Sequence, residues 1–257
     1  MVLILHQQVV YCNDLANFVK WVGGLGINEK ENKTMQHDFH YISKHDSKVQ
    51  EAYKDIQAIL REAQDLLRPK FTFRFDVVGS YKRNMITYDS KSNVGYDFDF
   101  NIEVNDDDET YKPKQLKNML QKAIGAVCVK YGYDYPEDST RVLTIKMKNR
   151  RESRILHSCD FAIVNNYIDD EGYECQEYIH FDKPHGNYTW CEQPDGYYML
   201  PEKIDWIKEN GLWDVEMRDL YIEKKNKNDN PDIHSRAIFA MTVHEICQKH
   251  GFYEDEK

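Results

Sequence analysis

Two aspartates stand one residue apart in the run DFDFNIEV, which covers residues 97–104. Side chains alternate between the two faces of a β-strand. A strand over this run places Asp97 and Asp99 on one face with Asn101 and Glu103, and it places the apolar residues on the other face. Two carboxylates so close repel each other unless they are protonated or bridged by cations. Mg²⁺ suits such a pair because it prefers oxygen ligands and leaves room for phosphate oxygens.

A third acid interrupts another apolar run. Asp160 lies between Cys159 and Phe161 in ILHSCDFAIV. Three acids on neighbouring strands form the arrangement that a two-metal phosphoryl-transfer site needs. We therefore expect Asp97, Asp99 and Asp160 to be catalytic and metal-binding residues, with Mg²⁺ or alternatively Mn²⁺ as the ion.

A Gly-Ser pair follows the alternating run FTFRFDVV, and it supplies groups suited to phosphate. Gly79 lets the backbone approach a phosphate closely. Ser80 offers a hydroxyl, and Lys82 and Arg83 add positive charge. We expect all four residues to bind the phosphates of a nucleotide.

Each motif alone has an ordinary explanation. A DxD pair arises easily by chance in a chain with 44 acidic residues, and many such pairs are solvated edge positions. A lone Gly-Ser pair is weaker still. The ordered set of strand, Gly-Ser, basic pair, DxD strand, helix and second acidic strand is much rarer by chance than either motif.

The elements that must position these residues follow from periodicity. An apolar stripe after Asp46 and Ser47 predicts a helix that Pro69 ends. Alternation predicts a strand at Phe71–Val77, and a helix begins at Pro113. Further elements are expected as a short helix at 12–23, strands at Arg141–Lys148 and Ile155–Val164, and helices at Pro201–Asn210 and Ser235–His250.

The remaining stretches have the composition of loops. We expect loops at 28–45, at 84–95 and at Lys224–Asn230, whose sequence KKNKNDN predicts a solvated segment. The stretch from Val164 to about Leu200 is expected to be loop-rich. The order of elements predicts an α+β fold, in which helices flank a mixed β-sheet. We expect a catalytic core with N-terminal helices over residues 1–200 and a short helical part over 201–257.

Composition limits the function classes. The net charge is -10 over 257 residues, which argues against general, charge-driven binding of DNA or RNA and so against a DNA-binding regulator. Six cysteines occur without a CxxC pair, which favours a reduced, cytoplasmic protein. The apolar start MVLILHQQVVYC is too short for a signal peptide or a membrane span, so no membrane association is expected.

The ordered set resembles the DNA polymerase β-like nucleotidyltransferase superfamily, whose pattern is hG[GS], then Dh[DE]h, then h[DE]h. The matching residues are VGS at Val78–Ser80, DFDF at Asp97–Phe100 and CDF at Cys159–Phe161. Within that superfamily, GSYKRNM, the long helix before it and NYTWCEQPDGYY at Asn187–Tyr198 look most like bacterial CD-NTases and the related oligoadenylate synthetases. The resemblance covers roughly residues 46–200.

The chain departs from that pattern in three places. Met85 stands where many relatives have a threonine, the interval from Gly79 to Asp97 is long, and the helical tail is short for a CD-NTase. These departures concern the product more than the chemistry. The resemblance also implies that an aromatic residue near Tyr197 faces the nucleobase, so Tyr197 is a further candidate for nucleotide binding.

Two other clusters have a functional and an ordinary explanation. Zinc could bind the set Cys175, His180, His185 and Cys191, because some relatives carry a zinc-binding insertion there, but the spacings match no standard signature and an ordinary loop is favoured. The second cluster surrounds the basic turn KNRRESR. It is either a solvated hairpin tip or a contact for an acceptor RNA or an activating nucleic acid.

These residues together predict a Mg²⁺-dependent, template-independent nucleotidyltransferase. It would transfer NMP from an NTP to a hydroxyl acceptor and release pyrophosphate. A nucleotide acceptor would give a cyclic or linear oligonucleotide signal, whereas a tRNA, a protein or a small molecule would make the enzyme a modifying transferase or a toxin. A catalytically inactive nucleotide-binding module is the remaining alternative. An activating partner is left open.

Overall fold

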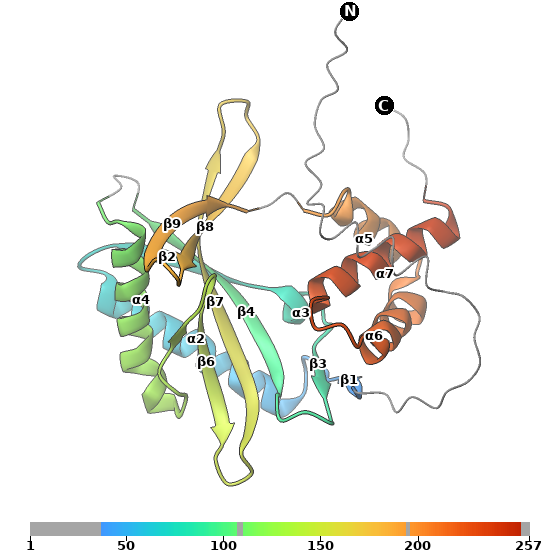
Figure 1. The fold of residues 1–257 in the computed structure, drawn as a ribbon, viewed down its shortest axis with the longest axis horizontal. Helices are drawn as coiled ribbons and strands as arrows, with labels where there is room; N and C mark the ends of the chain where they lie inside the picture. The colour runs from blue at the N-terminus through green and yellow to red at the C-terminus, as the bar shows by residue number, and fades with distance from the viewer. Residues whose placement is uncertain (1–36, 107–109, 194–195, 253–257) are drawn as a thin grey trace, which may run out of the picture. The chain divides into compact units, whose positions relative to one another are not determined.

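A seven-stranded mixed sheet lies at the centre of the residues that this computed structural model describes, 37–106, 110–193 and 196–252 (Figure 1). Five strands follow the order β2-β4-β7-β6-β5, β8 pairs with the C-terminal end of β7, and β9 pairs with β8. β4 is parallel to β7, and β2, β6 and β8 are antiparallel to their neighbours. The bounds are β2 Thr72–Val78, β4 Tyr96–Asn105, β5 Glu137–Asp138, β6 Val142–Asn149, β7 Arg154–Ile168, β8 Glu174–Asp182 and β9 Asn187–Glu192.

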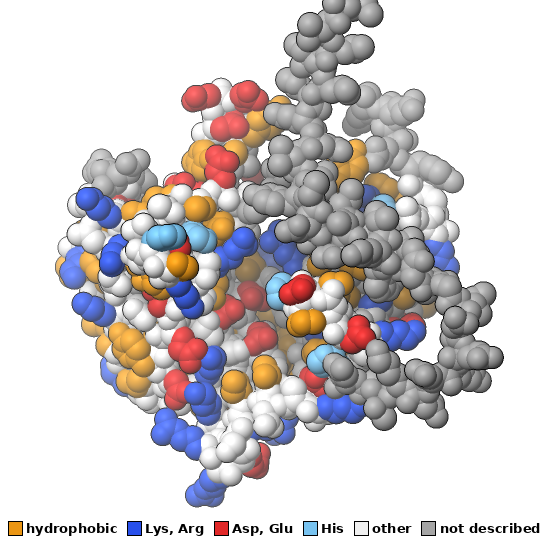
Figure 2. All heavy atoms as spheres, in the orientation of Figure 1, with side chains coloured by type: hydrophobic (Ala, Val, Ile, Leu, Met, Phe, Trp, Pro, Cys, Tyr) orange, Lys and Arg blue, Asp and Glu red, His pale blue; other side chains and the backbone are white. Residues whose placement is uncertain are grey.

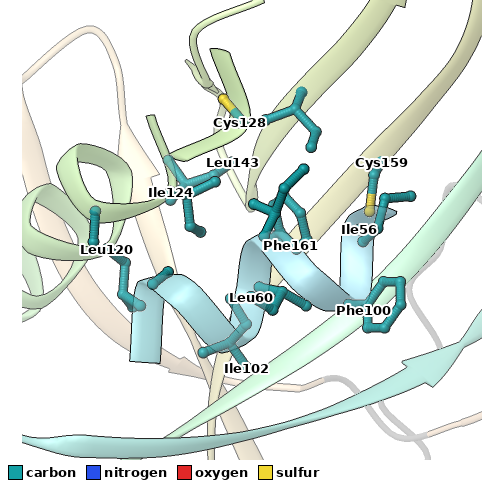
Figure 3. Packing of buried hydrophobic residues seen from close by; sticks show 14 of the residues in the cluster. Ile56, Leu60, Phe100, Ile102, Leu120, Ile124, Cys128, Leu143, Cys159 and Phe161 are labelled. Carbon is teal, nitrogen blue, oxygen red and sulfur yellow. The ribbon is translucent and has the colours of Figure 1, made fainter. Parts of the chain in front are cut away.

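Two amphipathic helices pack on the sheet and share its core. They are α2, Ser47–Leu67, and α4, Pro113–Cys128, which is followed by the 3₁₀ turn η1, Val129–Tyr131. The Asp46 side chain caps α2 by accepting a hydrogen bond of 2.9 Å from the backbone N–H of Lys48, as expected for an N-cap. Figure 3 shows apolar side chains of both helices meeting Phe100 of β4 and Phe161 of β7, which are 1 % and 0 % exposed. The helical stripes and the apolar strand faces therefore build one core, as predicted.

The C-terminal helices form a second apolar cluster. They are α5, Leu200–Glu209, the π-helical turn η2, Trp213–Met217, α6, Arg218–Lys227, and α7, Ser235–His250. Buried Met85, which lies just after the short helix α3, Gly79–Lys82, belongs to this cluster. The departure at Met85 thus has a structural reason, since its side chain joins the segment after α3 to the helices.

A two-stranded sheet links the same helices to the central sheet. It pairs β1, Phe39–Tyr41, with β3, Thr87–Asp89. The Asn226 side chain of α6 accepts a hydrogen bond of 2.5 Å from the backbone N–H of Phe39. The described residues form one compact unit, and the domain boundary expected at residue 200 stays a prediction.

Several predicted loops are wrong. β7 continues to Ile168, and β8 and β9 occupy much of the stretch expected to be loop-rich up to Leu200. β1 lies within 28–45 and β3 lies within 84–95, because these short strands pair with each other. α6 continues to Lys227 into the segment expected to be solvated. The helix expected at 12–23 lies outside the described residues, and no helix within the described ranges is long and apolar enough to span a bilayer.

Candidate active site

The two aspartates of β4 lie on the face opposite the core, as the alternation predicts. Phe98 and Phe100 are 0 % and 1 % exposed, whereas Asp97 is accessible to solvent and Asp99 is half-buried. β4 thus carries its core residues and its acids on opposite faces. On the side of the molecule seen in Figure 2, acidic and basic side chains gather in a hollow between the sheet and the C-terminal helices.

The third acid is the register partner of the second. Asp160 of β7 lies opposite Asp99 in the parallel β4–β7 ladder, and Ser158 lies opposite Asp97. Opposed residues on one face have β-carbons about 5 Å apart. The structure therefore brings Asp97, Asp99 and Asp160 together on adjacent strands, and their assignment as catalytic and metal-binding residues remains a prediction.

Gly79 packs directly against the second aspartate. Its φ is +66°, a conformation that side chains disfavour, and a β-carbon at this position would lie 2.1 Å from Oδ2 of Asp99. Glycine is required here because the start of α3 lies against the carboxylate. This contact joins the Gly-Ser motif to the acids, and it places half-buried Ser80 on the residue that follows.

The three carboxyl groups oppose one another's ionisation. Burial raises the pKa of Asp99 to about 6. Repulsion from Asp160 and then Asp97 adds to that increase. Burial also raises the pKa of Asp97 and Asp160 above the usual range. For Asp97 this occurs although solvent reaches the side chain, because the surrounding protein still displaces part of its water.

Two hydroxyl groups hold Asp97 and Asp160 by hydrogen bonds, and sequence analysis did not identify either hydroxyl. Thr144 Oγ1 of β6 donates a hydrogen bond of 2.6 Å to Asp160 Oδ1, and Ser158 Oγ donates to Asp97 Oδ1. Each hydroxyl lowers the pKa of the carboxyl that it contacts. Both residues lie opposite their acid in the ladders, so the strand register, once known, would have indicated them.

Arg83 approaches the acids from the segment after α3. Its guanidinium stacks 4.5 Å from the ring centroid of Phe239 in α7, and its charge opposes the rise in the pKa of Asp99. The Nε atom is buried and has no hydrogen-bond partner. Lys82 is exposed at the end of α3. The two predicted phosphate-binding cations therefore differ in setting, since one is packed against α7 and the other faces solvent.

A third cation, Lys225, comes from the segment expected to be a solvated loop. Lys225 of α6 is 7 % exposed, its Nζ donates a hydrogen bond of 2.8 Å to Thr87 Oγ1, and it lies 3.9 Å from the ring centroid of Phe39. Burial lowers the pKa of Lys225 to about 8, and the charge of Asp97 opposes that shift. Lys225 also lines a cavity of about 460 Å³ beside the start of α7. A lysine-rich polar run gives no signal of such burial, so sequence analysis missed this residue.

Asp97, Asp99 and Asp160 offer the kind of ligand that a hard divalent cation prefers. All three offer oxygen ligands, and a cation would offset the repulsion that raises the pKa of Asp99. In the described ranges, no three His, Cys, Asp or Glu side chains are already grouped so that they could hold a metal ion. Asp97 and Asp160 are instead hydrogen-bonded to hydroxyls.

The candidate zinc ligands and Tyr197 lie outside the group formed by the three aspartates and Gly79. Cys175 and His180 are on β8, and Cys191 is on β9. His185 lies in the turn between these strands, and its Nδ1 donates a 2.6 Å hydrogen bond to Asp182 Oδ2. These four residues form no metal-binding group in the part of the chain that the structure describes. Separately, Tyr197 lies just before α5 and is 38 % exposed. Its role in nucleotide binding stays a prediction.

Comparison with solved structures identifies the fold. A structure of Vibrio cholerae DncV cyclic AMP-GMP synthase in complex with the linear intermediate 5' pppA(3',5')pG matches with a TM-score of 0.54 and 12 % identity over 85 % of this chain and 70 % of that chain. The chain has the CD-NTase nucleotidyltransferase fold. The CD-NTase-like fold expected from the sequence is thereby confirmed.

Two further structures are similar at lower scores. Elizabethkingia meningoseptica CdnE cyclic dinucleotide synthase with GTP and Apcpp matches with a TM-score of 0.48 and 15 % identity over 79 % of this chain and 70 % of that chain. The 3'-deoxy ATP bound form of Vibrio cholerae DncV has a TM-score of 0.48 and 17 % identity, and it covers 82 % of this chain and 54 % of that chain. No protein-family model and no curated protein matches the sequence.

Proposed function

We propose that this chain is a nucleotidyltransferase that transfers NMP from an NTP to a hydroxyl acceptor and releases pyrophosphate. The observation that carries the proposal is the pairing of Asp99 with Asp160 on one face of the sheet, with Gly79 of the Gly-Ser motif packed against Asp99. The CD-NTase fold supports it, because the matching synthase was solved with a linear nucleotide intermediate.

The chain's basic and hydroxyl groups are assigned to the phosphates. Ser80 and Lys82 lie on α3, whose first residue contacts Asp99, and Lys225 of α6 interacts through its charge with Asp97. Charge-assisted hydrogen bonds from such groups to phosphate oxygens are stronger than neutral ones. We assign Ser80, Lys82 and Lys225 to the triphosphate and Arg83 to supporting Asp99 through its charge.

The acids are assigned to the reacting centre. Mg²⁺ or Mn²⁺, held by Asp97, Asp99 and Asp160, would offset phosphate charge and lower the pKa of the attacking hydroxyl. The acceptor oxygen forms a bond to the α-phosphorus while the bond from that phosphorus to the bridging oxygen breaks. Asp160, whose Oδ1 is hydrogen-bonded to Thr144, takes the proton of the hydroxyl. The chain contributes chiefly position and charge.

For the acceptor we propose a second nucleotide, so that the product is a cyclic or linear oligonucleotide signal. The fold supports this choice over a tRNA, a protein or a small molecule. The test is to incubate the purified protein with α-labelled NTPs, singly and mixed, with Mg²⁺ or Mn²⁺, and to resolve the products. Small phosphatase-resistant products are expected.

A variant with Asp97→Ala and Asp99→Ala is the control and should convert no NTP. Label found on added RNA or on protein would show that the enzyme is a modifying transferase and not a signal synthase. Conversion by the double variant at the wild-type rate would refute the active site itself.

A further inference from the structure

The long strand β7 joins two turns of opposite charge. The basic turn, residues 148–155, connects β6 to β7 and carries Lys148, Arg150, Arg151 and Arg154. The acidic turn, residues 168–174, connects β7 to β8 and carries Asp169, Asp170, Glu171 and Glu174. Residues 155–182 contain no lysine or arginine. Figure 1 shows the two turns projecting at opposite ends of the strands, and Figure 2 shows acidic and hydrophobic side chains at one tip and basic side chains at the other.

The acidic turn presents apolar groups to solvent in an ordered conformation. Ile168 and Tyr173 are 63 % and 65 % exposed. The Asp169 side chain accepts hydrogen bonds of 3.0 and 2.8 Å from the backbone N–H groups of Glu171 and Tyr173. Apolar side chains on a fixed, charged turn are suited to docking, because little conformational freedom is lost on binding. This turn therefore has the properties of an interaction site.

The basic turn offers a complementary surface. It borders an open recess of about 320 Å³ lined by Lys148, Asn149, Arg150, Ser153, Arg154 and Ile155. Asp134 pairs with both Lys148 and Arg150, at 2.5 and 3.3 Å, so a single carboxylate faces two cations. The Arg150 side chain remains 85 % exposed, and Arg154 Nε is buried without a hydrogen-bond partner. The turn thus keeps positive charge beside a recess that can receive an apolar side chain.

We propose that the acidic turn of one copy of this chain docks on the basic turn of a second copy. The two turns cannot meet within one copy, since a strand of 15 residues separates them by about 50 Å. A second copy is the occupant that the structure favours, because each copy supplies both complementary surfaces. Such a contact joins unlike surfaces. A single contact between copies extends into rings or open chains, whereas an antiparallel pair that engages both turns of each copy closes with two-fold symmetry.

The contact is small, which determines how it must be measured. Two hairpin tips bury less area than a standard stable interface, so we expect association only at high protein concentration. Screening by salt weakens attraction between exposed charges. Sedimentation velocity of the whole protein, from micromolar to several hundred micromolar, should show assemblies that grow with concentration and that decrease at about 0.5 M salt.

Two charge-reversed variants make the test specific. The first, Arg150→Glu with Arg151→Glu, has two acidic ends. The second, Asp170→Lys with Glu171→Lys and Glu174→Lys, has two basic ends, because Asp169 is then the one acid left in residues 168–174. Each alone should remain monomeric, and an equimolar mixture should associate, because every acidic end then meets a basic end. This recovery on mixing also shows that both variants are folded.

A control variant changes the charge by the same amount as the first variant, at positions outside both turns. Lys183→Glu with Lys208→Glu alters exposed residues outside both turns and should associate like the wild type. A wild-type protein that is monomeric at every concentration at low salt overturns the proposal. So does self-association of either charge-reversed variant, or a mixture that stays monomeric.

Discussion

Gly79 and Asp99 lie so close together that a β-carbon on Gly79 would be 2.1 Å from the Asp99 carboxylate. The two residues come from α3 and β4, and their contact holds the Gly-Ser segment against the acids. A methyl group has no room there. Glycine is therefore required for two reasons: it permits the left-handed backbone conformation, and it leaves Asp99 in place.

Gly79→Ala should therefore impair both folding and turnover. The left-handed conformation alone costs about 1–2 kcal/mol for alanine. Displacement of Asp99 should add to this cost and reduce NTP conversion by about tenfold or more. Gly186→Ala is the matched control, since Gly186 has φ +67° and open space around its β-carbon position. Equal losses of melting temperature and activity in both variants would contradict the Asp99 contact.

Thr144→Val removes the hydroxyl that holds Asp160 and keeps the side-chain shape. We expect kcat to fall by about tenfold, as for a hydrogen bond to a charged group, with the KM for NTP nearly unchanged. Thr144→Ser restores the hydroxyl and should recover most of the rate. Steady-state kinetics of the three proteins test this. A rate that does not change in Thr144→Val would exclude a positioning role.

Lys225→Met removes a buried cation near Asp97 without opening a cavity. If Lys225 contacts phosphate, the KM for NTP should rise by about tenfold or more. The melting temperature should stay the same or rise, because a desolvated ammonium group is removed. Lys227→Met, at an exposed position two residues later, is the control and should match the wild type. A KM for Lys225→Met equal to the wild-type value would remove Lys225 from the site.

His157 should make stability depend on pH. It is 8 % exposed, stacks on Tyr96 and shares a 2.8 Å hydrogen bond with the Tyr133 hydroxyl. Burial lowers the pKa of His157 to about 4 from an ordinary 6.5. Between these values the unfolded chain binds more protons than the folded chain, so stability present above pH 6.5 is lost as the pH falls toward 4.

The loss from this residue is about 3 kcal/mol. Denaturant melts at several pH values should show a smaller loss for His157→Gln, which keeps a hydrogen-bonding group near Tyr133. His45→Gln, at an exposed position, should retain the wild-type dependence. If wild type and His157→Gln lose the same free energy of unfolding between pH 7 and pH 4, the buried neutral histidine is not responsible.

Local periodicity was enough to predict the core and the acids. The stripe of α2 and the alternation around Phe98 and Phe100 each place their residues on the observed faces. The acids could be predicted because alternation fixes the face of Asp97 and Asp99, and because Asp160 interrupts an apolar run. The grouping of Asp160 with the pair also required that their strands be neighbours, as the β4–β7 ladder shows.

The missed features depend on tertiary contacts or on a weak turn signal. Lys225 is buried only because Phe39 and Thr87 reach it from the small sheet, and Thr144 acts only because β6 pairs with β7. β8 could have been predicted, since DDEG, which ends at Gly172, has the composition of a hairpin turn between two runs suited to strands. The abundance of polar residues in β8 and β9 hid that signal.

Asp160→Asn tests the central claim most directly, because it preserves shape and removes one charge from the triad. Binding of a non-hydrolysable NTP with Mg²⁺, measured by calorimetry, and NTP conversion should be compared between this variant and the wild type. We predict binding within a few-fold of wild type and conversion reduced by about two orders of magnitude or more, as expected when an interaction made mainly in the transition state is lost. Conversion at the wild-type rate would contradict the three-carboxylate site, and loss of binding together with conversion would contradict the separate role of Asp160.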